Sequence, residues 1–253
     1  MATENVKSAH RVFKILEVFS REQRALSVAE IALECNYPQS STSALMRTVV
    51  ELGYLSFDRV NRTYRPTLRL PLLVNWVSTS LFKGDEILQL MQELSERTNE
   101  TILLCAENGR YARYIHLIEA TGSLRLHAVA GDVRPYTQTA TGLMLLSTWD
   151  NRRLAGFIHR ANSEEQDPIR RVDLSALIKQ LETIRQDGYA VSLGGYIRGG
   201  GAVGMLLPRQ NDEPPMSIGI GGPQANVVEN SESWVKLMRT LIPKYFTTQD
   251  ANT

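Results

Sequence analysis

Five small polar residues stand in a row early in one apolar-periodic segment, and their side chains suit contacts with nucleic acid. They are Gln39, Ser40, Ser41, Thr42 and Ser43. A glutamine amide can hydrogen-bond adenine in two places, and serine or threonine hydroxyls can reach base edges or phosphate oxygens. Arg47, one helical turn further on, is better suited to a phosphate. The alternative is that the run only caps and solvates a surface helix.

Three short helices are expected to position this run. Apolar residues at helical spacing predict the first helix over residues 8–21, with Ser8 as its N-cap. Ser27 and Glu30 have the spacing of a capping box, which predicts a second helix that ends near residue 36.

The third helix carries the polar run. Pro38 suits a first turn and Gly53 a C-terminal stop, so this helix should run from about Pro38 to Leu52. Apolar residues on one face should hold it to its domain and leave the polar run exposed. That apolar face consists of Leu45, Met46, Val49 and Leu52.

A basic hairpin is expected next. Residues 54–70 hold two short aromatic and β-branched runs around a polar turn at 58–62. Arginines here would neutralise phosphate charge or enter the minor groove; they are Arg59, Arg62 and Arg65. Three short helices followed by a basic hairpin describe a winged helix-turn-helix, so DNA contact is favoured over a purely structural role.

The rest of the chain predicts a connector and an α+β domain. Residues 70–83 are apolar nearly all round, which suggests a helix buried against a partner subunit. Beyond them, strand-like runs alternate with helical blocks. Strands are expected at 101–106, 111–118, 123–129, 189–193, 202–207 and 216–220, and helices at 85–98, 140–161, 174–186 and 231–246. The predicted organisation is a winged helix-turn-helix at 1–69, a linker or dimerisation helix at 70–84 and an α+β domain at 85–253.

Composition excludes several classes of protein. The 253 residues are 43% hydrophobic and 22% charged with a formal net charge of +1, as expected for a soluble chain with a sizeable core. No run approaches about 18 apolar residues and the N-terminus lacks a signal-peptide core, so we expect no membrane partner and a cytoplasmic location. Cys35 and Cys105 lack CxxC spacing, which favours two buried thiols over a disulfide or zinc site.

Signals for catalysis are weak. The four histidines have neither metal-ligand spacing nor a neighbouring nucleophile, so we expect no metal, no cofactor and no enzymatic activity. Residues 199–204 read GGGAVG and match the dinucleotide fingerprint formally. A strand rather than a helix should follow them, so a loop over a ligand pocket is favoured.

Four segments resemble the IclR family of bacterial transcriptional regulators. They are AEIALECNYPQSSTSALMRTVVELGYL, GDVRPYTQTATGLMLLS, IRQDGYAVS and IGIGGP, which cover almost the whole chain in order. The resemblance implies a winged helix, a dimerising linker helix and an effector-binding domain with a GAF-like or profilin-like sheet. It also implies a homodimer or dimer-of-dimers tetramer on double-stranded operator DNA, and a small organic acid as effector.

The chain departs from the family inside the polar run. Family members often carry His-Arg where this chain has Ser43 and Ala44. Its operator sequence therefore cannot be borrowed from relatives. We expect binding to depend more on Gln39, Ser40, Arg47 and the hairpin.

A second site is expected at residues 131–142. Thr139 or Thr141 can cap a helix there, and the free N–H groups of a helix start suit an anion. On spacing alone, a plain capped helix with nothing bound is favoured. The resemblance implies instead that this helix start holds the carboxylate of the acid, at Ala140, Thr141 and Gly142.

The resemblance implies further pocket positions on the strands. They are Ser192, Ala202, Gly219 and Gly221, with rim positions at His127, Val129, Arg134 and Tyr136 that suit a sheet or loop role equally well. Relatives that bind small keto acids often carry polar residues at the first four. A roomier, more apolar pocket and a bulkier acid, aromatic acids included, are therefore expected.

The leading interpretation is a DNA-binding regulator of metabolic genes whose small-molecule domain alters the spacing of its recognition helices. The alternative is a cytosolic enzyme or ligand sensor whose N-terminal helices serve only assembly. The basic hairpin would have no role in that alternative, so the regulator is favoured.

Overall fold

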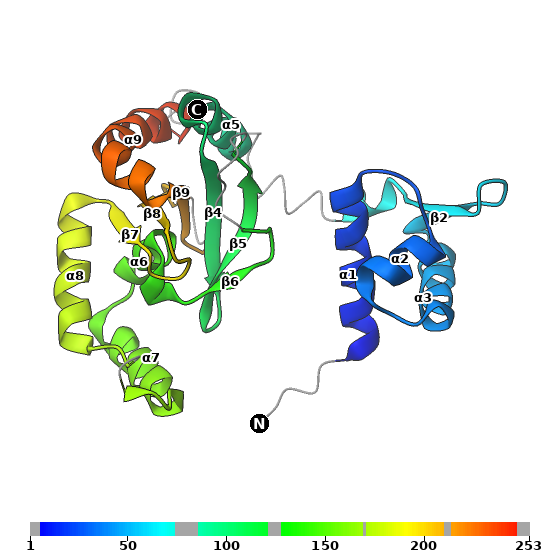
Figure 1. The fold of residues 1–253 in the computed structure, drawn as a ribbon, viewed down its shortest axis with the longest axis horizontal. Coiled ribbons are helices and arrows are strands. Elements are labelled where there is room, and N and C mark those ends of the chain that lie inside the picture. The colour runs from blue at the N-terminus through cyan, green and yellow to red at the C-terminus, as the bar shows by residue number, and fades with distance from the viewer. Residues whose placement is uncertain (1–5, 74–85, 121–127, 169–170, 210–213, 247–253) are drawn as a thin grey trace, which may run out of the picture. The chain divides into compact units, whose positions relative to one another are not determined.

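The computed structural model describes residues 6–73, 86–120, 128–168, 171–209 and 214–246. Its contacts divide the chain into two compact units, Met1–Lys83 and Gly84–Thr253, each considered on its own below (Figure 1). Of the connector expected at 70–84, residues 70–73 are helical and the remainder lies outside the described residues.

The N-terminal unit is a three-helix bundle with a small antiparallel sheet. Its helices are α1 (Lys7–Glu22), α2 (Val28–Cys35) and α3 (Gln39–Glu51), and its strands are β1 (Leu26–Ser27), β2 (Leu55–Asp58) and β3 (Thr63–Pro66) in the order β1-β3-β2. The Asp58 carboxylate closes the β2–β3 hairpin, because it accepts hydrogen bonds from the backbone N–H groups of Val60 and Asn61. The expected winged helix-turn-helix fold is confirmed.

Helix ends in this unit follow the sequence pattern with two exceptions. The capping box is present, since Ser27 and Glu30 exchange side chain-to-backbone hydrogen bonds of 2.8 and 3.3 Å. Helix α1 starts one residue before Ser8 without a side-chain cap, so the expectation of a Ser8 N-cap was wrong. Leu52 was also misplaced in the core: it lies at the C-cap of α3 and is 53% exposed.

The C-terminal unit is built on one curled, antiparallel six-stranded sheet with the order β6-β5-β4-β9-β8-β7. The strands are β4 (Thr101–Asn108), β5 (Tyr111–Ile118), β6 (Val133–Arg134), β7 (Ala190–Leu193), β8 (Gly200–Leu206) and β9 (Met216–Pro223). The helices are α5 (Glu86–Thr98), the short η1 (Tyr136–Gln138), α6 (Ala140–Ser147), α7 (Asn151–Glu164), α8 (Leu174–Asp187) and α9 (Gln224–Phe246).

Helices cover both faces of this sheet (Figure 1). A side chain at Gly204 would meet the backbone of Ala140 in α6, whereas one at Gly201 would meet Val227 in α9. Residues of opposite parity on one strand point to opposite faces, so α6 and α9 lie on different sides of β8. Helix α8 packs outside α6, and α5 packs beside α9.

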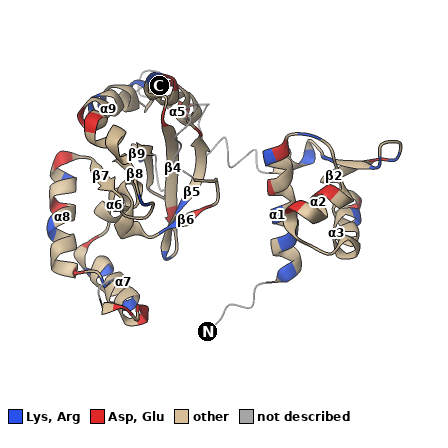
Figure 2. Cartoon of the chain, viewed as in Figure 1, with Lys and Arg blue, Asp and Glu red and all other residues tan. Residues whose placement is uncertain are grey.

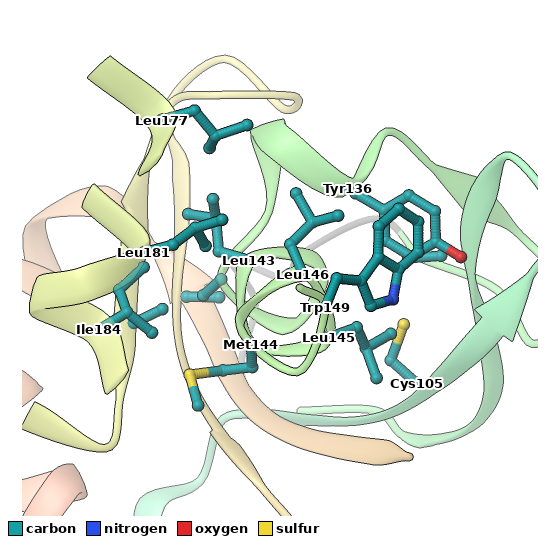
Figure 3. Close-up of a cluster of buried hydrophobic side chains, with 14 of the residues drawn as sticks. Cys105, Tyr136, Leu143, Met144, Leu145, Leu146, Trp149, Leu177, Leu181 and Ile184 are labelled. Carbon is teal, nitrogen blue, oxygen red and sulfur yellow. The ribbon is translucent and has the colours of Figure 1, made fainter. Parts of the chain in front are cut away.

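Helix α6 lies at the centre of this unit, and all eight of its residues are buried. Leu143, Met144 and their neighbours meet α8 on one side and an aromatic group on the other (Figure 3). The α8 contacts are Leu177, Leu181 and Ile184; the aromatic group is Tyr136, Trp149 and Phe157, whose ring centroids lie 5.2–5.7 Å apart. This packing fixes the start of α6 against strands β7 and β8.

Most expected elements of the C-terminal unit are present, with four differences. The helical block expected at 140–161 is broken into α6 and α7, because Asp150 caps a new helix by accepting from the Arg153 N–H at 2.7 Å. Helix α9 begins at residue 224 rather than 231. Residues 200–204 form strand β8 rather than a loop, and the turn that precedes them contains Gly194 and Gly199 at positive φ. The strand expected at 123–129 falls largely outside the described residues, and Val129 is not in a strand.

Removal of the carboxylate from the capping box should weaken α2 in a pH-dependent way. The pKa of Glu30 falls to about 2, chiefly because its carboxylate accepts from the Ser27 N–H. The stabilisation is thus complete above the ordinary pKa near 4.5 and is lost as the pH falls toward 2. Glu30→Gln should cost about 1 kcal/mol at pH 7, seen as roughly fivefold faster amide exchange in α2. The exposed Glu51→Gln is the control; an equal difference from wild type at pH 7 and pH 3 would contradict the linkage.

Substitution of two helical glycines by alanine should change the stability of the protein in opposite directions. A Cβ at Gly142 would lie 2.4 Å from the Tyr136 carbonyl oxygen, whereas nothing lies within 4 Å of one at Gly156. Gly142→Ala should therefore destabilise the protein by about 1–3 kcal/mol, and Gly156→Ala should stabilise it by about 0.5–1 kcal/mol. Urea unfolding followed by tryptophan fluorescence measures both, and similar shifts in the two variants would show that the α6 contact is not tight.

Candidate functional site

The first site is the outer face of α3. Gln39, Ser40 and Arg47 are exposed there, and Ser41 and Ser43 are partly exposed. Ala44, which belongs to the departure from the family pattern, is exposed on the same face. This surface therefore presents one amide, several hydroxyls and one cation on a regular helix.

Thr42 was wrongly grouped with this surface. It is 0% exposed, and its hydroxyl donates to the Pro38 carbonyl oxygen at 3.1 Å. In a helix of 3.6 residues per turn, Thr42 shares its face with the buried Met46 and Val49. The threonine is part of the core of the N-terminal unit, and its position in a polar run concealed this.

The β2–β3 hairpin adds positive charge without acidic partners. Arg59 and Arg62 lie in its turn and Arg65 in β3, and all three side chains are exposed. Among the described residues, no carboxylate forms an ion pair with any of the three. By contrast, Arg21 and Arg24 of the same unit pair with Glu22, Glu34 and Glu30. Figure 2 shows basic residues on the hairpin, where their charge is available to an anionic partner.

The second site is a narrow cleft at one end of the sheet in the C-terminal unit. Its cavity volume of about 30 Å³ is enough for one or two water molecules. The lining comes from β5, β6, the segment before α6, β7, the turn before β8, and β8. The residues are Tyr114, Arg134, Gln138, Thr139, Ser192, Gly195, Tyr196, Ile197, Gly200, Gly201 and Ala202.

The start of α6 is satisfied by hydroxyl groups of the protein itself. The Thr139 Oγ1 accepts from the Gly142 N–H at 3.1 Å, and the Ser192 Oγ accepts from the Ala140 N–H at 3.0 Å. Two donors expected to meet an anion are thus already occupied. Thr139 and Ser192 line the cleft, with Ala140 directly behind Ser192.

The remaining expected pocket residues separate into several groups. Ala202 lines the cleft. Gly219 instead lies against Thr141, since an added Cβ would be 2.7 Å from the threonine Cγ2, and Gly221 pairs with Thr101 and Ala202 within the sheet. Tyr136 belongs to the aromatic group in the core, Val129 is 56% exposed outside the cleft, and His127 lies outside the described residues.

The small residues on the strands do not provide the expected extra room. Space above Gly204 and Gly219 is filled by the backbone of Ala140 and by Thr141. The cleft lies further toward the strand ends, and its aromatic wall of Tyr114 and Tyr196 was missed by sequence reasoning. Alternation along β5 directs Tyr114 inward, but nothing in the sequence relates it to the distant turn that holds Tyr196.

Burial removes acid–base chemistry from the groups near the cleft. It raises the pKa of Tyr114 to about 12 and that of the Cys105 thiol to about 12. Both groups therefore stay protonated at neutral pH. Cys35 is also buried and unpaired, as expected for the two thiols.

The described ranges contain neither a metal-binding cluster nor a membrane-spanning helix. Within them, no three His, Cys, Asp or Glu side chains gather where they could hold a metal ion. No helix in the same ranges combines the length and apolar composition needed to cross a bilayer.

Known proteins share both halves of this chain. Residues 8–59 match the IclR helix-turn-helix domain, and residues 85–241 match the bacterial transcriptional regulator IclR C-terminal domain. The HTH-type transcriptional regulator KdgR of Dickeya chrysanthemi is 28% identical over 188 residues, which are 74% of this chain and 61% of that protein.

Solved structures share the fold. The IclR protein of Thermotoga maritima aligns over 95% of this chain and 98% of its own, with a TM-score of 0.66 and 22% identity. An IclR homolog from Microbacterium hydrocarbonoxydans, complexed with 4-hydroxybenzoate, aligns over 96% and 100%, with a TM-score of 0.68 and 18% identity. At these identities the likeness shows the fold alone.

The first match covers nearly all of the three N-terminal helices and β2, and the second covers all six strands of the C-terminal sheet, in that order. The chain belongs to the IclR family of bacterial transcriptional regulators.

Proposed function

We propose that this regulator binds operator DNA through α3 and the β2–β3 hairpin, and that a small organic acid in the cleft changes that binding to control metabolic genes. Family members are transcription regulators rather than enzymes, so the enzyme alternative is rejected. The observation that carries the DNA part is the set of hairpin arginines without acidic partners beside the exposed polar face of α3. The proposed organisation keeps 1–69 for DNA, 70–84 for the linker and 85–253 for the effector.

Two kinds of DNA contact are proposed. Gln39, Ser40 and the partly exposed Ser41 and Ser43 meet base edges and phosphates in the major groove. Arg47, Arg59, Arg62 and Arg65 neutralise phosphates. The first group supplies sequence discrimination, and the second supplies affinity that depends on salt.

The effector proposal rests on the donors and aromatic rings around the cleft. The Ser192 hydroxyl uses a lone pair to accept from Ala140, which leaves its own O–H available to an acceptor on a ligand. Tyr114, Tyr196 and Ile197 provide apolar surface. The Microbacterium homolog is complexed with an aromatic acid, 4-hydroxybenzoate, which supports a ligand of that size here. Such a ligand requires the turn that carries Tyr196 and Ile197 to move outward, because the closed cleft is too small.

The proposed regulator acts as a homodimer or a dimer-of-dimers tetramer. Two winged helices on one operator require a fixed separation over successive half-sites. An effector regulates only by binding the DNA-competent and DNA-free arrangements with different affinities.

Loss of hairpin charge should weaken DNA binding and its salt dependence. Arg59→Ala with Arg62→Ala should lower affinity for DNA upstream of the protein's own gene and reduce the log–log salt slope by about 1 per arginine. Gel shift or fluorescence anisotropy between 50 and 200 mM salt measures both quantities.

The matched control changes net charge equally in the other unit, with Arg152→Ala and Arg160→Ala, two exposed arginines of α7. If the salt slope of the hairpin variant is unchanged, or if the control changes equally, the hairpin does not contact DNA. No binding by the wild type at low salt would reject the regulator proposal itself.

Larger acids should stabilise the protein more than the smallest keto acids. An acid at 100 times its Kd adds about 2.7 kcal/mol to the folded state, which raises Tm by roughly 5–10 °C for a domain of this size. A thermal-shift screen should therefore show larger shifts with benzoate-sized acids than with glyoxylate or pyruvate. Stabilisation by glyoxylate or pyruvate alone would contradict the size argument.

A further inference from the structure

Arg134 is the most deeply buried charge bordering the cleft. Its side chain is 9% exposed, and two of its three nitrogens have partners: Nη2 donates to the Asp132 carboxylate at 2.6 Å and Nη1 to the Val133 carbonyl oxygen at 3.0 Å. The third nitrogen, Nε, is fully covered and has no hydrogen-bond partner. A buried unpaired donor is costly, so an acceptor atom placed against this Nε–H would be strongly favoured.

Two tyrosines flank the same guanidinium. Its central carbon lies 4.6 Å from the ring centroid of Tyr196 and 5.3 Å from that of Tyr114, within cation–π distance in both cases. Tyr114 is buried in β5, whereas Tyr196 is 48% exposed in the turn before β8. The turn contains Gly194 and Gly199 at positive φ, a conformation that other residues rarely adopt. The guanidinium thus has one exposed aromatic neighbour, Tyr196, and one buried one, Tyr114.

The cleft offers at least two donors to a ligand, beside the polar side chains of Gln138 and Thr139. Besides Arg134 Nε–H, the Ser192 hydroxyl has its proton available, because it accepts from Ala140. The one carboxylate near the guanidinium, Asp132, is engaged by Arg134 and by the Val129 N–H at 3.1 Å. A ligand that fits these groups carries acceptor oxygens on a flat, apolar body.

We propose that Arg134 binds the carboxylate of a flat aromatic monocarboxylic acid through its unpaired Nε–H, with the ring of the acid against Tyr114 and Tyr196. This inference rests on the proposed effector function and names the ligand class and the anchoring residue. A planar guanidinium serves this role better than an ammonium group, because it hydrogen-bonds a carboxylate and stacks on rings at once. The Asp132 carboxylate offsets the positive charge of the Arg134 guanidinium and fixes the orientation of its N–H groups.

Isothermal titration calorimetry of the full chain against benzoate, 4-hydroxybenzoate and phenylacetate tests the proposal, with each acid compared with its neutral amide. Wild type should bind at least one acid ten times more tightly than the amide. Arg134→Gln should reduce acid affinity at least tenfold and amide affinity by a clearly smaller factor, because the amide loses a neutral hydrogen bond and the acid a charge-assisted one. Arg134→Lys should restore only part of the acid affinity. Tyr196→Ala, in the exposed turn, should weaken aromatic acids and leave acetate unchanged.

Arg152→Gln on α7 controls for net charge and should bind like wild type. Circular dichroism and the thermal midpoint establish that each variant is folded. If Arg134→Gln does not fold, the acid affinities of Arg134→Lys and Tyr196→Ala test the proposal instead. The proposal is overturned if wild type prefers none of the acids to its amide, or if a folded Arg134 variant binds acid as well as wild type does.

A gel shift separates this result from the regulator proposal. Arg134→Gln should bind DNA like wild type without ligand, since the substitution lies in the effector domain. A wild type that binds the acid through Arg134 but never binds DNA would reject regulation and leave the ligand assignment intact.

Discussion

Helix α6 is enclosed on every side, and a helix in that position must satisfy its end groups from within the protein. Its first donors are taken by Thr139 and Ser192, and the Ser217 hydroxyl donates to the Thr141 carbonyl oxygen at 2.9 Å. These bonds connect the helix to β7 and β9 at once. The position of the cleft follows, because the strands can approach the helix start only where their residues are small.

The Ser192 hydroxyl can make two hydrogen bonds: it accepts one from the Ala140 N–H, and it can donate one to a ligand in the cleft. The Ala140 N–H is the first of the helix, and Ser192 also lines the cleft, so the serine's own proton is available to a ligand there. A ligand that accepts that proton would polarise a bond already made to the central helix. Helix α6 also packs on α8 and on five strands, so a shift at its start would affect contacts across the effector unit.

Local sequence signals predicted what depends on local geometry. The Ser27–Glu30 box, the hairpin around Asp58 and strand β5 lie where the pattern put them, because capping, turn formation and alternation act over a few residues. Thr42 was predicted at the surface from its residue type and is buried on the core face of α3. Leu52 was predicted in the core from its helical spacing and is exposed, because α3 ends there. The cleft itself could be predicted only in part. Thr139 was predicted as a helix cap from its residue type, and Ser192 and Ala202 came from resemblance. Tyr114 and Tyr196 meet through a sheet topology that no short segment encodes.

The close contacts of Gly204 with Ala140 and of Gly219 with Thr141 also restrict substitution beside the cleft in this chain. Any side chain larger than hydrogen at these positions must displace the backbone of the central helix or a buried threonine. Neither glycine lines the cleft, so substitution at these two positions would act on the ligand only through the central helix. Substitution in the turn around the exposed Tyr196 would instead change the surroundings of a ligand directly.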